Sequence, residues 1–127
     1  MSMIKTVFGE LSFDTGWKTK TTITLFTKSY DILVKAKAYF EKDGVTQKQE
    51  NAFSDFINQK VEKLKIVEAL IKGYSEKSSA SRFLPRTILF QRDGSYAMLL
   101  DDTEDPEGGI AVILSPTKAV VSQDEYL

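Results

Sequence analysis

The sequence contains no cysteine and no histidine among its 127 residues. The lack of cysteine excludes disulfide bonds and thiolate chemistry. The lack of histidine removes the commonest general base and the usual zinc ligand, so the familiar Ser/His/Asp and Cys/His arrangements are excluded as well. Any catalysis would depend on carboxylates, lysine, arginine or tyrosine. We therefore predict a chain that is not an enzyme, has no catalytic residues and needs no metal or cofactor.

Long hydrophobic runs are missing too. The longest apolar stretches are about five residues, far short of the ~20 that cross a membrane. The N-terminal stretch MSMIKTVFGELSF lacks the apolar core and cleavage site of a secretory signal. A composition of 42% hydrophobic and 28% charged residues is typical of a globular protein. We expect one domain spanning residues 1–127, a cytoplasmic location and no membrane partner.

The net charge of −1 conceals a gradient along the chain. Residues 1–45 carry seven basic and five acidic side chains, and residues 46–77 carry six and five. Residues 78–127 carry four basic and eight acidic side chains, a net charge of −4. Phosphate contacts need clustered basic groups, so this acidic third disfavours nucleic acid as a partner. It favours a basic protein partner, because opposite potentials speed and orient docking.

Apolar and polar residues alternate with a period of two in three N-terminal segments, which are residues 5–14, 17–26 and 30–40. This period is typical of half-buried strands. Consecutive strands joined by short loops usually pair with each other. The pattern predicts three antiparallel strands.

The period changes after Gly44, where Thr46 and Gln49 match the S/T-x-x-E/Q capping box of a helix N-terminus. Apolar residues then recur at three- and four-residue steps through residue 76. They are Phe53, Phe56, Ile57, Val61, Leu64, Val67, Leu70, Ile71 and Tyr74. We predict one long amphipathic helix over residues 47–76.

Four further strands are expected after this helix, at residues 86–91, 96–100, 110–114 and 119–122. Asp93-Gly94 between the first two is a strong hairpin signal. The segment 110–114 (IAVIL) is apolar on both parities, which indicates a central strand covered on both faces. The predicted fold class is α+β: a mostly antiparallel sheet of about seven strands, three before and four after one long helix packed on one face.

The stretch DDTEDPEGG connects two of these strands and holds five carboxylates, Asp101, Asp102, Glu104, Asp105 and Glu107. Their spacing does not match a calcium-binding EF-hand loop, so we predict no metal site. A catalytic pair would need two carboxyls that converge in a cleft. Two interpretations remain open, namely a solvated turn and a docking surface for a basic partner. Gly108-Gly109 is expected to provide a positive φ or a close backbone approach.

Lysines on two predicted neighbouring strands form a second candidate surface. Lys18, Lys20, Lys35 and Lys37 lie on the parity opposite the apolar one. A platform for single-stranded nucleic acid would need exposed aromatic residues among them. We expect a solvated sheet face and no nucleic-acid partner.

Short motifs at both ends of the chain suggest a family. FGELSFDTGW, DPEGGIAV and QDEYL resemble a family of small bacterial domains of unknown function with the patterns G-x-L-x-x-D-x-x-W, D-P-E-x-G-I-A-V and a Q-D-x-x-L ending. The resemblance spans nearly the whole chain and implies a place in bacterial toxin–immunity neighbourhoods. It transfers no catalytic residue, but it draws attention to Asp14, Trp17 and Asp124 as a pocket or family motif.

These observations together predict an immunity-type binding protein that occludes a toxin through its acidic surface. We expect Asp101, Asp102 and Glu104 to meet basic groups of the partner, and Asp105 to Gly109 to act first as a connector. The alternative is a small-ligand or regulatory module with a pocket between helix and sheet.

Overall fold

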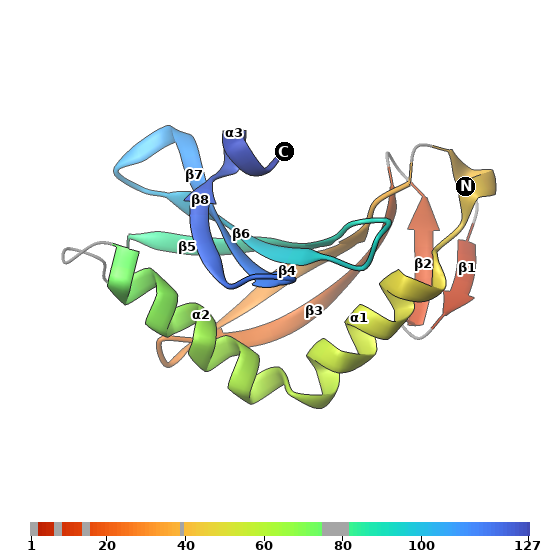
Figure 1. The fold of residues 1–127 in the computed structure, drawn as a ribbon, viewed down its shortest axis with the longest axis horizontal. Helices are drawn as coiled ribbons and strands as arrows, with labels where there is room; N and C mark the ends of the chain where they lie inside the picture. Colours follow the sequence, from red (N-terminus) through yellow and green to blue (C-terminus); the bar gives the residue numbers. More distant parts are fainter. Residues whose placement is uncertain (1–2, 7–8, 14–15, 39, 75–81) are drawn as a thin grey trace.

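The computed structural model describes residues 3–6, 9–13, 16–38, 40–74 and 82–127. Its strands form one eight-stranded sheet, in which the strand order follows the chain (Figure 1). The strands are β1 (Met3–Thr6), β2 (Gly9–Phe13), β3 (Trp17–Leu25), β4 (Lys28–Ala36), β5 (Phe83–Phe90), β6 (Tyr96–Asp102), β7 (Asp105–Ser115) and β8 (Ala119–Ser122). All neighbours are antiparallel except β4 and β5, which are parallel. An α+β fold with a mostly antiparallel sheet is thus confirmed.

The helices explain the one parallel pair. A short 3-10 helix (Glu41–Asp43), α1 (Gln47–Asn58) and α2 (Lys60–Tyr74) follow β4, and α1 and α2 lie on the same side of the sheet (Figure 1). This long connection carries the chain back across the sheet, so β5 begins beside β4 in the same direction. The short α3 (Gln123–Tyr126), which the sequence pattern did not predict, lies on the opposite side (Figure 1).

The prediction of one long helix is wrong, because the helix is divided at Gln59. The buried apolar residues are Phe53 and Phe56 in α1 and Leu64, Val67 and Ile71 in α2. A continuous apolar stripe after Phe56 would use positions 60 and 63, and both are lysines. The division lets each half turn its own apolar side to the sheet. Ile57 and Val61, beside the break, are left 39% and 67% exposed.

The predicted start of the helix is confirmed. Thr46 Oγ1 accepts a hydrogen bond from Gln49 N at 3.1 Å, and Gln49 Oε1 accepts one from Thr46 N at 2.9 Å. Gln49 is fully buried, and its Nε2 also donates to the carbonyls of Lys37 and Phe90, both at 3.0 Å. The capping residue therefore ties α1 to the chain following β4 and to the end of β5, where an unpaired carbonyl would be costly.

The predicted first strand is likewise two strands. Within residues 5–14, β1 and β2 form an antiparallel pair in which Thr6 lies opposite Gly9. Alternation of apolar and polar residues continued through the reversal, so the pattern alone could not show it. Among the described residues, the three strands expected before the helix are four, and the total is eight instead of about seven.

The core lies between the helices and one face of the sheet. Its largest fully buried side chains include Trp17, Phe56, Phe83, Phe90 and Tyr96. The segment 110–114 belongs to β7, which pairs with β6 on one side and β8 on the other and contacts both α2 and α3, so its prediction as an inner strand covered on both faces is confirmed. Ala111 and Val112 point to opposite faces of the sheet, and both are fully buried. This burial on both faces explains why β7 is apolar on both parities.

Candidate functional site: an acidic hollow beside the β6–β7 turn

The acidic stretch is part of a β-hairpin. The prediction that residues 105–109 act as a connector is wrong, because β7 begins at Asp105, and β6 continues through Asp102 before it. Asp101 pairs with Gly109 and Asp102 pairs with Asp105, so residues 106–108 are extra in β7. Such a bulge displaces the chain locally and re-aims its side chains.

The bulge forms one wall of a hollow of about 310 Å³. Asp101, Asp102, Asp105 and Glu107 line it, together with Asp124 of α3. Tyr74, at the end of α2, contributes an aromatic side chain. The structure thus brings four of the five carboxylates expected at a docking surface together with one expected from the family motif. The fifth, Glu104, does not line the hollow and pairs with Arg82 instead.

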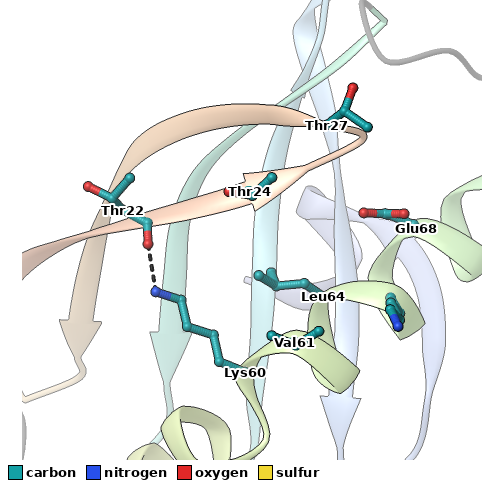
Figure 2. Close-up of a pocket in the computed structure, with 8 residues that line it drawn as sticks. Thr22, Thr24, Thr27, Lys60, Val61, Leu64 and Glu68 are labelled. Atoms are coloured by element: carbon teal, nitrogen blue, oxygen red, sulfur yellow. Dashed lines mark hydrogen bonds between the residues drawn. The ribbon is translucent and has the colours of Figure 1, made fainter.

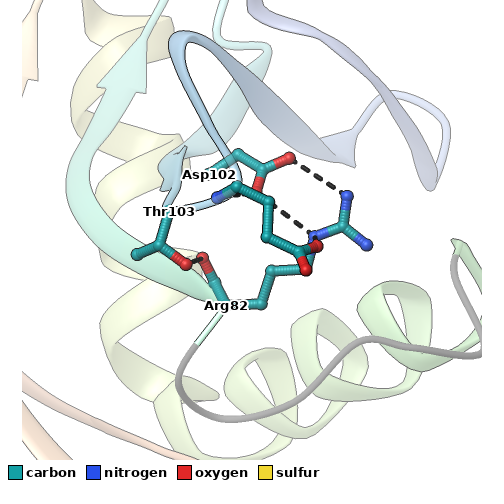
Figure 3. Close-up of polar contacts among 4 residues, drawn as sticks. Arg82, Asp102 and Thr103 are labelled. Carbon is teal, nitrogen blue, oxygen red and sulfur yellow. Dashed lines mark hydrogen bonds and ion pairs between the residues drawn. The ribbon is translucent and has the colours of Figure 1, made fainter.

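Arg82 pairs with two of the five carboxylates (Figure 3). Its Nε and Nη2 donate to the two carboxylate oxygens of Asp102, each at 3.2 Å, and Nε lies 2.8 Å from Glu104 Oε2. Thr103 binds the main-chain carbonyl of the same arginine. The backbone N and the side-chain Oγ1 of Thr103 donate to Arg82 O at 2.8 and 2.9 Å. Asp102 Oδ1 also accepts a hydrogen bond from Glu104 N at 2.9 Å. Asp102 and Glu104 therefore brace the turn.

The pairing affects the titration of Asp102. The hydrogen bonds from Arg82 hold the pKa of the Asp102 carboxyl below its usual range, against an opposing effect of burial. The same interaction raises the pKa of Arg82. A carboxylate whose pKa is lowered in the folded state stabilises the fold above its ordinary pKa of about 4, and that stabilisation is lost as the pH falls through the lower folded value.

We predict that Asp102→Asn unfolds more readily than the unchanged protein at pH 6, and that this difference shrinks as the pH falls from about 4 to about 2. The measurement is urea unfolding of both proteins at pH 6, at about pH 4 and at about pH 2. Glu62→Gln, which changes an exposed carboxylate of α2, is the control and should show no such convergence. A difference that stays constant over this range would contradict the structural role of the Asp102 carboxylate.

The remaining carboxylates of the hollow are more available than Asp102 for pairing with a basic group from outside the chain. Asp101 pairs with Arg86 at 2.7 Å, but both side chains are more than half exposed, so the pair is weak in water. Asp105, Glu107 and Asp124 have no basic partner within ion-pair distance in the part of the chain that the structure describes. Three charges of one sign around one hollow create a local negative potential.

Gln123 holds the hollow together, although the sequence pattern assigned it no role. Its Nε2 donates to Leu100 O at 2.8 Å, and Ile110 O lies 3.5 Å away, so α3 is tied across β6 and β7. Gly109 lies against this contact, and a Cβ there would be 2.6 Å from Leu100 O. The expected close backbone approach is therefore confirmed at Gly109, and positive φ is not its cause.

Of the other two residues that the family motif singled out, the structure describes only Trp17. Asp14 lies outside the described residues. Trp17 is 1% exposed, packs edge-on against Phe13 with ring centroids 5.2 Å apart, and does not line the hollow. Its burial in the core gives it a structural role.

Within the described ranges, no group of three or more carboxylates is arranged to hold a metal ion. No helix there has the length and apolar character needed to cross a membrane. The fold and the hollow thus define a small α+β protein with a negatively charged surface site. Comparison with family models, curated proteins and solved structures found no match.

Proposed function

We propose that this chain is a non-enzymatic, cytoplasmic binding protein that receives a basic segment of another protein in the acidic hollow. The observation that carries this proposal is the convergence of Asp105, Glu107 and Asp124 on one concavity without basic partners among the described residues. Asp101 lies on the same hollow and can exchange its exposed partner Arg86 for a group of the partner protein.

An arginine side chain fits this hollow best. A guanidinium group can donate to two carboxylates at once, and Tyr74 offers a ring on which it can stack. A hollow excludes part of the surrounding water, so charge pairs inside it are worth more than the 0.2–1 kcal/mol or so of an exposed pair. Peripheral carboxylates such as Glu104 would act mainly on the association rate.

In its more specific form, the proposal is that the partner is a toxin and that this chain is its immunity-type inhibitor. Support comes from the resemblance to small bacterial domains and from the net charge of −4 over residues 78–127. Many toxins act on nucleic acid and need a basic cleft for it, and an acidic protein can occlude such a cleft. A basic toxin domain encoded beside this chain's gene is the expected partner.

The test uses a fluorescein-labelled nine-residue peptide with four arginines, and binding is followed by fluorescence anisotropy at low and high salt. The variant Asp105→Asn/Glu107→Gln/Asp124→Asn should bind at least tenfold more weakly, because the three charge pairs that it loses would contribute about 1.5 kcal/mol together even at the roughly 0.5 kcal/mol of an exposed pair. Its affinity should also depend less steeply on salt.

A variant that removes three carboxylates elsewhere separates the hollow from general acidity. Glu41→Gln/Glu50→Gln/Glu62→Gln makes the same change of net charge on the helical side of the chain. Equal affinity of the two triple variants would sink the proposal that the hollow is the docking site. A partner encoded next to this chain that binds both variants equally well would contradict the immunity-type form in the same way.

A groove between α2 and β3 is the observation that favours the second candidate function, a module that binds a ligand between helix and sheet (Figure 2). Its volume of about 480 Å³ is in the range of known ligand sites. The groove runs along a strand, however, and does not close over its contents as a small-molecule pocket does. A small ligand is therefore the weaker alternative.

A further inference from the structure

The C-terminal part of β3 is an open strand edge. β2 pairs with β3 only at Trp17 and Lys18, whereas β4 pairs with β3 along its whole length. From Thr19 to Leu25, the side of β3 away from β4 has no strand beside it among the described residues. Unpaired main-chain groups on such an edge are a template for another extended chain.

The main-chain groups of Thr22 and Thr24 face this open side. Lys60 Nζ donates to Thr22 O at 2.6 Å across the gap, which shows the direction of that carbonyl (Figure 2). In an antiparallel pair, alternate residues direct both N–H and C=O away from the partner strand, so Thr24 points to the same side. Three of these main-chain groups have no hydrogen-bond partner over the described ranges. They are the N–H of Thr22, the N–H of Thr24 and the carbonyl of Thr24.

Helix α2 holds the edge at two points and leaves a space between them. Lys60 binds Thr22 O, and Glu68 Oε2 accepts a hydrogen bond from Phe26 N at 3.1 Å. The two helix residues are about 12 Å apart along the helix axis, and the two strand residues are about 13 Å apart along the strand. Helix and strand therefore run alongside each other over this length, with the groove between them.

The hairpin turn at the end of the groove is strained. Phe26 and Thr27 have φ values of 50° and 67°, a left-handed conformation that costs a non-glycine residue roughly 1 kcal/mol or more. Glu68 and the ammonium of Lys72, which lies 5.8 Å from the Phe26 ring centroid, hold this turn against α2. The turn thereby sets the spacing between the strand edge and the helix.

The lining of the groove combines an apolar wall with a net positive charge, because its two lysines outnumber its one carboxylate, Glu68. Leu64 and Val61 of α2 form the apolar part, and Val61 is 67% exposed. Lys60 (Figure 2) and Lys65 also line the groove, and neither has a carboxylate within ion-pair distance in the described part of the chain. A segment that fills this space should present apolar side chains toward α2 and negative charge toward the two lysines.

We infer that the groove captures an extended acidic segment of another protein, which adds to the edge of β3 as a further strand. The incoming main chain would donate to Thr22 O in place of Lys60 Nζ and bond with the free groups of Thr24. Lys60, released from the carbonyl, pairs with a carboxylate of the segment. This surface does not depend on the acidic hollow, because it takes a partner of opposite charge through different residues.

The experiment screens blocked seven-residue peptides that have glutamate at two alternate positions and mixed residues elsewhere. The best binder is then titrated into ¹⁵N-labelled protein. The amide signals of Thr22 and Thr24 should shift and become protected from hydrogen exchange, since both N–H groups would join a ladder. A peptide with N-methyl groups on alternate residues, which cannot donate to the edge, should not bind.

Two pairs of variants locate the binding. Thr22→Pro removes an edge-facing N–H without breaking the β3–β4 ladder and should weaken binding about tenfold, while Thr22→Ala, which keeps the N–H, should change it little. Lys60→Gln/Lys65→Gln should also weaken binding about tenfold. Its control is Lys42→Gln/Lys48→Gln, at exposed lysines that do not line the groove.

Three results would overturn the inference. Failure of every acidic peptide to bind at 1 mM would remove the site, and equal binding of the N-methylated peptide would show that side chains alone are recognised. A protein dimer that Thr22→Pro dissociates would assign the edge to a second copy of this chain. Circular dichroism of each variant distinguishes loss of binding from loss of folding.

Discussion

Gly109→Ala is expected to lower the free energy of unfolding by about 3 kcal/mol, the upper part of the range for overpacking a tightly filled site. A Cβ at this position would lie 2.6 Å from Leu100 O and 2.5 Å from Gln123 Nε2. The first neighbour is backbone inside the sheet and cannot move freely. The second is the amide that bonds to Leu100 O at 2.8 Å, so relief of the clash breaks the tie between α3 and β6.

Gly73→Ala is the matched control, because nothing lies within 4 Å of a Cβ at that position in α2. An alanine there should raise stability by about 0.5 kcal/mol, since it favours the helix over the unfolded chain. Urea unfolding of both variants, followed by circular dichroism, measures the difference. If Gly109→Ala were as stable as the unchanged protein, the close approach of Gly109, Leu100 and Gln123 would be contradicted.

The second large effect is expected from Tyr96 at high pH. Its side chain is 2% exposed and stacks on Phe90 with ring centroids 4.9 Å apart. Its hydroxyl is buried without a hydrogen-bond partner among the described residues. Burial raises the pKa of Tyr96 to about 12 from the ordinary value of 10.0, and the charge of Asp55 acts in the same direction.

The sign of the pH dependence follows from the proton balance. Between pH 10 and pH 12 an unfolded tyrosine has lost its proton, while Tyr96 in the folded protein still holds it. Stability is therefore fully retained below pH 10 and is lost as the pH rises toward 12. A difference of two pKa units corresponds to about 2.7 kcal/mol, an order-of-magnitude figure for this one side chain.

Tyr96→Phe should remove this loss and leave only the pH dependence of the other groups. At pH 7 the variant should be at least as stable as the unchanged protein, because it eliminates a buried hydroxyl without a partner. Urea unfolding at several values from pH 7 to pH 12 measures both effects. Tyr74→Phe changes a side chain that is 49% exposed and is the control. Parallel stability profiles for Tyr96→Phe and the unchanged protein would contradict the burial of the Tyr96 hydroxyl.

Local signals in the sequence predicted several elements of the fold well. The Thr46–Gln49 capping box begins α1, and Asp93-Gly94 forms the β5–β6 hairpin with Gly94 at a φ of 91°. Both depend on a few neighbouring residues whose hydrogen bonds or backbone angles are local. The periodicity of apolar residues did not show where the chain changes direction when the same periodicity continues across the change. The break at Gln59 and the reversal between β1 and β2 are the two examples.

The candidate site shows the same division. The sequence singled out the carboxylates of residues 101–107, but it could not show that Arg82 binds two of them. That contact joins residues 20 and 22 positions apart. The available charges are consequently Asp105 and Glu107, in the half expected to be a connector. The open edge of β3 was not foreseen, since it depends on how few residues of β2 pair with β3.

The sequence by itself determined the α+β class, the helix start at Gln47, the Asp93-Gly94 hairpin and the acidic character of the C-terminal third, because each depends on composition or on residues close in the chain. Only the tertiary structure decided that Asp124 joins Asp105 and Glu107 around one hollow, and that α2 lies along an unpaired edge of β3. Both arrangements depend on strand register and on the division of the helix. These follow from how the apolar faces of distant segments are buried together, and residue spacing in a single sequence does not record that.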